Sequence, residues 1–100
     1  VQAVLDMATR GSATALGWAN EIGSLEKGNA ADFCALSLDE SNMQPVHNVL
    51  SNVIYSATGM ENIITVVAGK VLYKNGTYTT IDYANILKEA MNLNDWLKNN

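Results

Sequence analysis

Two tight turns in the second half of the sequence constrain this 100-residue chain most strongly. Asn75-Gly76 lies between two β-prone runs, residues 70–73 and 77–81. An Asn-Gly pair in that setting is the strongest short-range signal for a β-hairpin. Ala68-Gly69 separates the first of these runs from another one, residues 63–67. The three runs therefore predict an antiparallel three-stranded meander.

Apolar residues recur at helical spacing on either side of the predicted meander. One set, with spacings of three and four, predicts a helix over residues 46–58, with Pro45 at or just before its first turn and Gly59 at its end; its members are Val46, Val49, Leu50, Val53, Ile54 and Ala57. Asp82 is a suitable N-cap for a closing helix over residues 83–98. That helix would carry Ile86, Leu87, Ala90, Met91, Leu93 and Leu97.

The first residues also have a helical pattern, with apolar side chains at Val1, Val4, Leu5 and Ala8 and no capping residue before them. We expect the chain to begin inside, or just before, a helix of a longer polypeptide. Gly11 should interrupt this helix, and a second short helix over residues 12–16 should end at Gly17. The apolar run 33–38 predicts a strand buried on both faces. Together these elements predict an α+β fold.

The composition excludes several classes of function. Almost half of the residues are apolar and the net charge is −4, and no run of Lys or Arg provides a footprint for nucleic acid. No apolar stretch reaches the roughly 20 residues of a membrane span, and there is no signal peptide. We therefore expect a cytoplasmic protein with neither nucleic-acid nor membrane partners. Cys34 is the single cysteine, so it has no disulfide partner within the chain, and its apolar run predicts a buried, inert thiol.

Residues for catalysis are few. A metal site usually needs three or more convergent protein ligands, whereas His47 is the single histidine; it is expected to be solvated or to cap a helix. A nucleophile–base–acid set could be assembled from Ser51 or Ser56 with His47 and Asp39, but there is no Gly-x-Ser-x-Gly elbow to support it. Asp32 is expected to be a loop carboxylate that accepts backbone N–H groups.

Other conspicuous residues also favour structural roles. Gly23 and Gly28 spell neither a dinucleotide-binding nor a phosphate-binding motif, so we expect them to make turns. Trp18 and Trp96 lie far apart in the sequence and are expected to be packing residues. The sequence thus predicts no catalytic, cofactor-binding or metal-binding residue in this chain.

Four segments, in the same order, resemble the end of amidohydrolase-superfamily enzymes. Residues 22–33, Ile-Gly-Ser-Leu-Glu-Lys-Gly-Asn-Ala-Ala-Asp-Phe, resemble the signature Gly-Ser-Leu-Glu-Pro-Gly-x-x-Ala-Asp-Leu, with Lys27 in place of proline. Residues 7–17 resemble the stretch that closes the barrel, and residues 65–76 resemble the terminal hairpin. Residues 44–57, from Gln-Pro-Val-His to Val-Ile-Tyr-Ser-Ala, resemble a helix of the branch that holds chlorohydrolases and S-adenosylhomocysteine/methylthioadenosine deaminases; Val49-Leu50 replaces its Pro-Val.

The resemblance implies a (β/α)₈ barrel flanked by a small β-sandwich to which both chain ends contribute. A zinc or iron ion, held by a His-x-His pair, two further histidines and an aspartate, would activate the water that attacks a ring carbon bearing an amino or chloro group. All those ligands would precede Val1. Residues 1–20 would then be the last barrel helices, and residues 21–100 the C-terminal sandwich portion.

Three hypotheses follow. In the first, the chain is a structural, non-catalytic part of a metal-dependent hydrolase, its main partner is the rest of the parent polypeptide, and alone it self-associates through its apolar helix and unpaired strand edges. In the second, it is a stand-alone interaction or binding module with a sandwich-like fold. The third, an independent small enzyme, requires an active site that the residues do not provide. Substrate, metal identity and the choice between deamination and dechlorination stay open.

Overall fold

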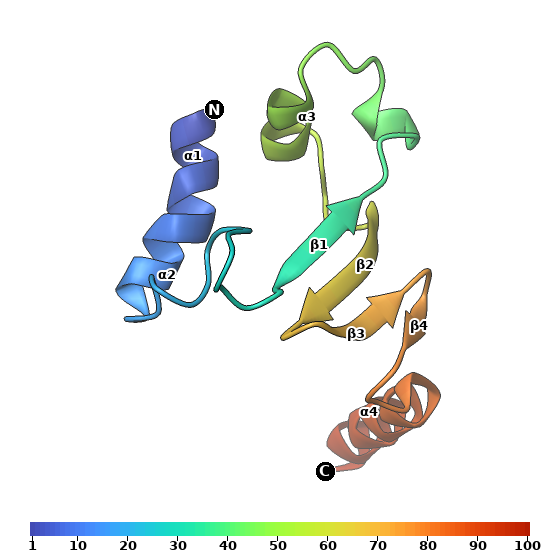
Figure 1. Cartoon of the computed structure of the whole chain (residues 1–100). Helices are drawn as coiled ribbons and strands as arrows, with labels where there is room; N and C mark the ends of the chain where they lie inside the picture. The colour runs from blue at the N-terminus through green and yellow to red at the C-terminus, as the bar shows by residue number, and fades with distance from the viewer.

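The computed structural model describes all residues, 1–100, and shows an α+β chain built around one antiparallel sheet (Figure 1). Its elements, in chain order, are α1 (Gln2–Asp6), the π-helical turn η1 (Met7–Gly11), α2 (Ser12–Ala15), β1 (Phe33–Leu36), the 3₁₀ turn η2 (Ser41–Met43), α3 (Val49–Tyr55), β2 (Asn62–Val67), β3 (Lys70–Lys74), β4 (Thr77–Tyr78) and α4 (Tyr83–Asn99).

The sheet contains the predicted meander and one further strand. Its order is β1-β2-β3-β4, with every neighbouring pair antiparallel, so the meander is confirmed and β1 is added beside β2. The third strand is shorter than predicted, because β4 ends at Tyr78. Thr79 still donates its N–H to Leu72 O at 3.0 Å, after which the chain leaves the sheet and enters α4.

A two-residue turn joins β3 to β4. Asn75 has φ of 46° and Gly76 has φ of 87°, so both central residues adopt the positive φ that the favoured hairpin turn requires. Asparagine tolerates this region better than other side chains do, and glycine adopts it freely. The hairpin signal in the sequence is therefore confirmed at the level of backbone conformation.

The N-terminal helix is longer than predicted, since Gly11 does not interrupt it. Gly11 has φ of −62° and ψ of −44° and stays helical. The predicted break is instead a π-helical turn over η1, and the helix continues into α2. Gly17, with φ of 77°, ends the segment as a left-handed terminator, as expected.

Helix α3 is shorter than the predicted helix 46–58. Asn48, in extended conformation, is its N-cap, and the Asn48 side chain accepts the Ser51 N–H at 3.0 Å. The cap fixes the start at Val49, because an N-cap residue stands outside the helical conformation. Pro45 therefore precedes the helix by several residues and is not in its first turn. The closing helix, predicted over residues 83–98, is confirmed as α4, with the Asp82 side chain accepting the Asn85 N–H at 3.1 Å.

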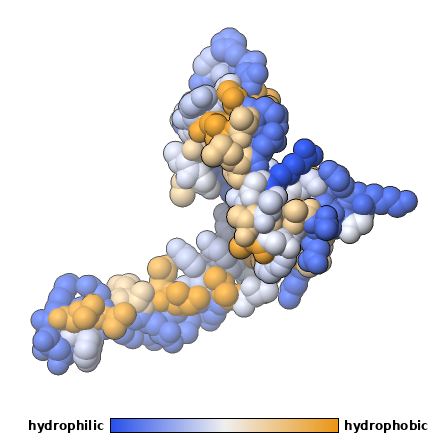
Figure 2. Space-filling model, turned by 90° about the vertical axis from the view of Figure 1, so that its left-hand side faces the viewer, coloured by the Kyte–Doolittle hydropathy of each residue, from blue (hydrophilic) through white to orange (hydrophobic).

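The chain buries little of itself. Its Cα radius of gyration is 17.5 Å, against about 13 Å for a compact domain of this length. Its accessible surface is 7662 Å², which exceeds by roughly 2,000 Å² that of a compact protein of this mass. Figure 2 shows one cause: α4 projects from the body as an arm whose apolar side chains are uncovered.

Candidate functional site

The serine, histidine and aspartate considered for nucleophilic catalysis are not brought together. His47 is exposed and makes no hydrogen bond, and the helix cap beside it is Asn48. Ser51 lies in α3, where its backbone N–H binds that cap. Asp39 makes a local contact, donating its backbone N–H to Ser37 Oγ at 3.2 Å. No hydrogen bond links a base to a nucleophile, so the arrangement offers no such chemistry.

Asp32 has the structural role expected of it. Its Oδ1 accepts the backbone N–H of Ala68 at 2.7 Å. This bond ties the start of β1 to the turn between β2 and β3, 36 residues further along the chain. A carboxylate accepting a backbone N–H makes a strong, charge-assisted hydrogen bond. Asp32 therefore fixes the register at one end of the sheet.

Gly23 allows the loop after α2 to lie directly against the helix. It has φ of 93°, and a Cβ at this position would lie 2.8 Å from Ala13 Cβ and 3.1 Å from Thr9 O. Ala13 is one of the few buried residues of the chain. Both the conformation and the close approach require glycine here, so the expectation that Gly23 makes a turn is confirmed.

Cys34 and the two tryptophans differ from expectation. Cys34 is exposed, and so is Phe33 beside it in β1. Because successive side chains point to opposite faces of a strand, both faces are open at the start of β1, and the expectation of a strand buried on both faces was wrong. Trp18 and Trp96 are 54% and 59% exposed, so neither is packed within this chain. These apolar groups lack cover because the chain is too small to supply a second layer over them.

Cys34 lines a hollow of about 610 Å³ between the N-terminal helix and the sheet. The helix contributes Ala8, Thr9, Ser12, Ala13 and Leu16, the following loop residues 22–25, and the strands Phe33, Cys34 and residues 65–67. The lining is mainly apolar and its one ionisable acid, Asp32, is already bonded to Ala68. Its chemistry suits the seating of apolar side chains.

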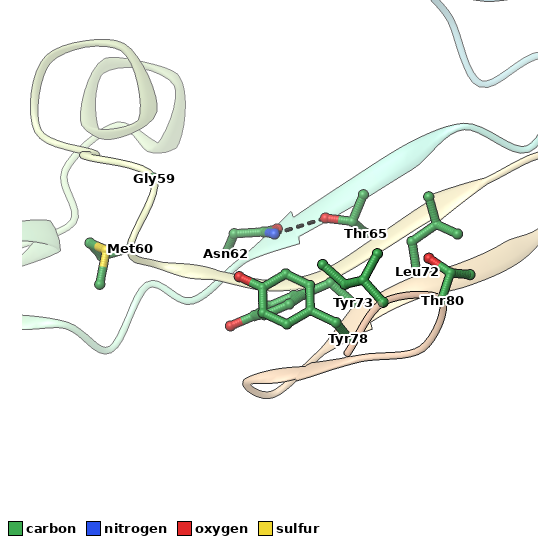
Figure 3. A pocket seen from close by; sticks show the side chains of 9 residues that line it. Gly59, Met60, Asn62, Thr65, Leu72, Tyr73, Tyr78 and Thr80 are labelled. Carbon is green, nitrogen blue, oxygen red and sulfur yellow. Dashed lines mark hydrogen bonds between the residues drawn. The ribbon is translucent and has the colours of Figure 1, made fainter. Parts of the chain in front are cut away.

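A second hollow, of about 430 Å³, lies over the other end of the sheet (Figure 3). Tyr73 and Tyr78 face each other across β3 and β4, with ring centroids 5.1 Å apart at an edge-on angle of 60°. Tyr78 also stacks on Tyr83 at the start of α4. The side chains of Asn62 and Thr65 are hydrogen-bonded at 2.9 Å beside them. The hollow contains no carboxylate, histidine or lysine, so it has no acid–base pair for catalysis.

The principal polar cluster surrounds Glu61, a residue that the sequence reading did not single out. Glu61 is only 3% exposed. Its carboxylate accepts the backbone N–H groups of Thr58 and Gly59 at 3.0 and 2.9 Å, the Thr58 hydroxyl at 3.1 Å, and the side-chain amide of Asn42. Asn42 also donates to Ser56 O at 3.0 Å. The pattern Thr-x-x-Glu, in which a glutamate bonds back to the N–H of a threonine three residues earlier, was the available local signal.

These bonds change the acidity of Glu61. The Asn42 amide, followed by the backbone N–H of Glu61 itself and the Thr58 groups, lowers the pKa of the Glu61 carboxyl from 4.5 to about 2, against the opposing effect of burial. Hydrogen bonds to the ionised form stabilise that form. Every acceptor position of the carboxylate is used for holding loops together, so Glu61 is a structural group.

The chain holds no set of metal ligands. No three side chains of His, Cys, Asp or Glu lie close enough together to bind a metal ion. The potential nitrogen ligand, His47, lies in the loop before α3, and the potential sulfur ligand, Cys34, lies in β1. The residues present therefore do not fit a catalytic zinc site, which requires three protein ligands. Separately, no helix is long and apolar enough to cross a lipid bilayer.

The α+β fold and the two apolar hollows do not by themselves define a class of protein, but the sequence does. The sequence profile of the Amidohydrolase family matches residues 1–72. The chain therefore belongs to the amidohydrolase family.

Related proteins agree with this assignment. The chain is 45% identical, over 97% of its length, to 5-methylthioadenosine/S-adenosylhomocysteine deaminase of Desulfovibrio desulfuricans, and 49% identical over 94% of its length to the enzyme of that name from Nitratidesulfovibrio vulgaris. It spans only 22% and 21% of those relatives.

Solved structures give the same result. An adenosine deaminase from Xanthomonas campestris with bound zinc matches 96% of the chain with a TM-score of 0.89 and 33% identity, over 22% of its own length. Atrazine chlorohydrolase from Arthrobacter aurescens, complexed with zinc, matches 89% of the chain with a TM-score of 0.79 and 35% identity, over 19% of its length. The fold of this chain thus occurs as a part of larger zinc-containing hydrolases.

Proposed function

We propose that this chain is the C-terminal, non-catalytic portion of a metal-dependent hydrolytic deaminase. In this proposal residues 1–20 are the last helices around a (β/α)₈ barrel, and residues 21–100 are the C-terminal part of a composite β-sandwich. The excess of uncovered surface carries the proposal. Roughly 2,000 Å² that a compact protein would bury is open, and this is the size of surface that obligate interfaces bury.

The relatives support deamination over dechlorination. The deaminases named above are 45% and 49% identical to the chain, against 35% for the atrazine chlorohydrolase. We therefore propose 5′-methylthioadenosine and S-adenosylhomocysteine as substrates of the whole enzyme, with zinc as its metal. The zinc ligands would come from residues outside this chain, since those present do not fit a site.

In such an enzyme the chain would cover the outer face of the barrel and complete the β-sandwich. The hollow beside Cys34 and the hollow beside Tyr73 would seat apolar side chains of the barrel and of N-terminal strands, and the apolar side of α4 would lie against the same body. Burial of this surface stabilises the assembly by about 25 cal/mol per Å² of apolar area. Catalysis then depends on the chain through the rigidity that it gives the barrel.

A chimeric enzyme tests this function. The segment of the Desulfovibrio desulfuricans relative that corresponds to this chain would be replaced by the chain, and deamination of 5′-methylthioadenosine measured after zinc loading. We expect an active chimera, an inactive isolated chain, and an inactive or insoluble relative when the segment is deleted. A folded, zinc-loaded chimera without activity, or full activity of the deleted relative, would overturn the proposal.

The isolated chain should also associate with itself. The outer edge of β1 is unpaired, and α4 and the N-terminal helix expose apolar side chains; unpaired edges and apolar patches of this kind promote association. Light scattering over a range of concentrations measures it. A strictly monomeric species at high concentration contradicts this expectation and favours the alternative, a stand-alone interaction module.

A further inference from the structure

The tip of the β3–β4 hairpin carries an asparagine in an unusual chemical setting. Asn75 is the only asparagine of the chain that is followed by glycine. Both Asn75 and Gly76 are exposed. The Asn75 side chain makes no hydrogen bond, and the Gly76 N–H donates none. By contrast, the amides of Asn29, Asn42 and Asn52 are held by partners.

We propose that Asn75 is a site of spontaneous deamidation that converts the hairpin tip to isoaspartate. The deprotonated backbone nitrogen of Gly76 attacks Cγ of the Asn75 side chain. A C–N bond forms, the Cγ–Nδ2 bond breaks, and the amide nitrogen leaves as ammonia. Water then opens the cyclic imide at either carbonyl, which gives aspartate or isoaspartate. Glycine favours the first step because it has no side chain to shield its nitrogen.

The tip belongs to a short hairpin at the edge of the sheet. Strand β4 has two residues and pairs with β3 at Tyr73–Tyr78 and Lys74–Thr77. Beyond these pairs, the Asn75 N–H donates to Ile63 O at 2.9 Å and the Thr79 N–H to Leu72 O at 3.0 Å, so a few bonds at the edge of the sheet hold the tip. Short terminal ladders that are open to solvent unfold locally at small free-energy cost. Such opening frees Asn75 from its φ of 46° and lets the Gly76 nitrogen approach the side-chain carbon. The structure thus combines a free nucleophile, a free amide and an easily opened turn.

The product would alter the surface beside the turn. Isoaspartate inserts an additional carbon into the backbone and adds one negative charge. A two-residue hairpin turn has no room for a longer backbone without a change of register. The rings of Tyr73 and Tyr78, whose centroids lie 5.1 Å apart, would separate. Both rings line the hollow shown in Figure 3, so the hollow would change shape.

Mass spectrometry of the aged chain tests the inference. The chain would be incubated at mildly acidic and at mildly alkaline pH and digested, and each asparagine located by fragmentation. Asn75 should convert about tenfold or more faster than Asn20, a difference of about 1.4 kcal/mol in activation free energy. Asn20 is an exposed, unbonded loop asparagine that is followed by glutamate. Conversion should accelerate with pH, since the nucleophile is the deprotonated amide, and should yield product that an isoaspartyl methyltransferase labels.

The matched variant is Asn75→Gly, which keeps a turn sequence compatible with positive φ and removes the reactive amide. Its hairpin peptide should gain no mass, and NMR contacts between Tyr73 and Tyr78 should persist through an incubation that abolishes them in the unaltered chain. Equal conversion of Asn20 and Asn75, or an unchanged Asn75 at alkaline pH, would overturn the inference. Neither outcome bears on the proposed enzymatic role, because the inference requires the hairpin alone.

Discussion

The turn around Glu61 and the helix α4 are stabilised in opposite ways. At Glu61 a nearly buried carboxylate is satisfied entirely by groups of the same chain, from Asn42 to Gly59. Helix α4 has a capped start at Asp82, yet none of its residues is buried, and its apolar side chains contact little of the rest of the chain. Local signals therefore suffice to form both elements. Only the Glu61 turn is also buried and hydrogen-bonded by other parts of the same chain.

This difference shows which parts of the chain depend on a neighbour. In proteins most of the stability of a helix comes from packing of its apolar face. Figure 2 shows that face of α4 uncovered along the whole arm. Mutations in the Glu61 turn should therefore change the stability of the isolated chain. Mutations in α4 should change stability only when another part of the protein covers this helix.

The largest expected difference in stability is between truncating a buried methionine and truncating an exposed one. Met43 is fully buried beside the Glu61 turn, and Met91 on α4 is 68% exposed. Met43→Ala should lower the free energy of unfolding by about 2–5 kcal/mol, because it removes buried methylenes and leaves a cavity. Met91→Ala should change it by less than about 0.5 kcal/mol. Urea denaturation of the isolated chain measures both changes. Equal losses of stability would show that α4 contributes as much to the isolated chain as the buried residues beside Glu61 do. In the chimera, Met91→Ala should become destabilising.

The next effect is the acid sensitivity of the Glu61 turn. The pKa of Glu61 falls from 4.5 to about 2 on folding, so its contribution to stability is complete above pH 4.5 and is lost as the pH falls from 4.5 toward 2. Glu61→Gln should lower stability at neutral pH and flatten this acid dependence.

Glu26→Gln is the matched control for Glu61→Gln. The Glu26 carboxylate is exposed and lies 3.5 Å from Arg10, and such surface pairs contribute little. This variant should retain the acid dependence of the unaltered chain in thermal melts followed by circular dichroism. A Glu61→Gln chain with an unchanged acid transition would show that the turn is held by other contacts.

The smallest expected effect compares the two helix caps. Asn48→Ala and Asp82→Ala each remove one capping bond, worth about 1 kcal/mol. Because α3 packs against α1, loss of the Asn48 cap should shift the unfolding midpoint. Loss of the Asp82 cap should reduce far-ultraviolet helicity while the midpoint stays constant. A shift of the midpoint in both variants would mean that α4 unfolds together with the sheet.

Much of the local structure could be predicted from the sequence, because it depends on short-range chemistry. The Asn75-Gly76 hairpin, the Asp82 cap and the backbone-binding role of Asp32 are confirmed. The helix after Pro45 was predicted too long, since apolar periodicity extends past the true cap at Asn48. Gly11 was predicted to break a helix, but a single glycine costs only about 1 kcal/mol there.

The candidate sites were harder to predict. The local Thr58-x-x-Glu61 pattern could have indicated the turn, but the contact with Asn42, 19 residues away, could not be read from any local pattern. Cys34 was predicted to be buried from the apolar character of its neighbours. Apolar residues indicate that a surface is suited to burial, but the presence of a covering layer is a tertiary property.

The sequence by itself determined the hairpin turn, the order of the helices and strands though not all of their ends, and the family to which the chain belongs. These features depend on backbone preference, capping and side-chain periodicity, all of which act over a few residues. Only the tertiary structure decided that Glu61 joins two distant loops and that α4 and the start of β1 stay open. Those outcomes depend on which surfaces meet in space, and a chain with so small a core leaves most of its apolar side chains without a surface to meet.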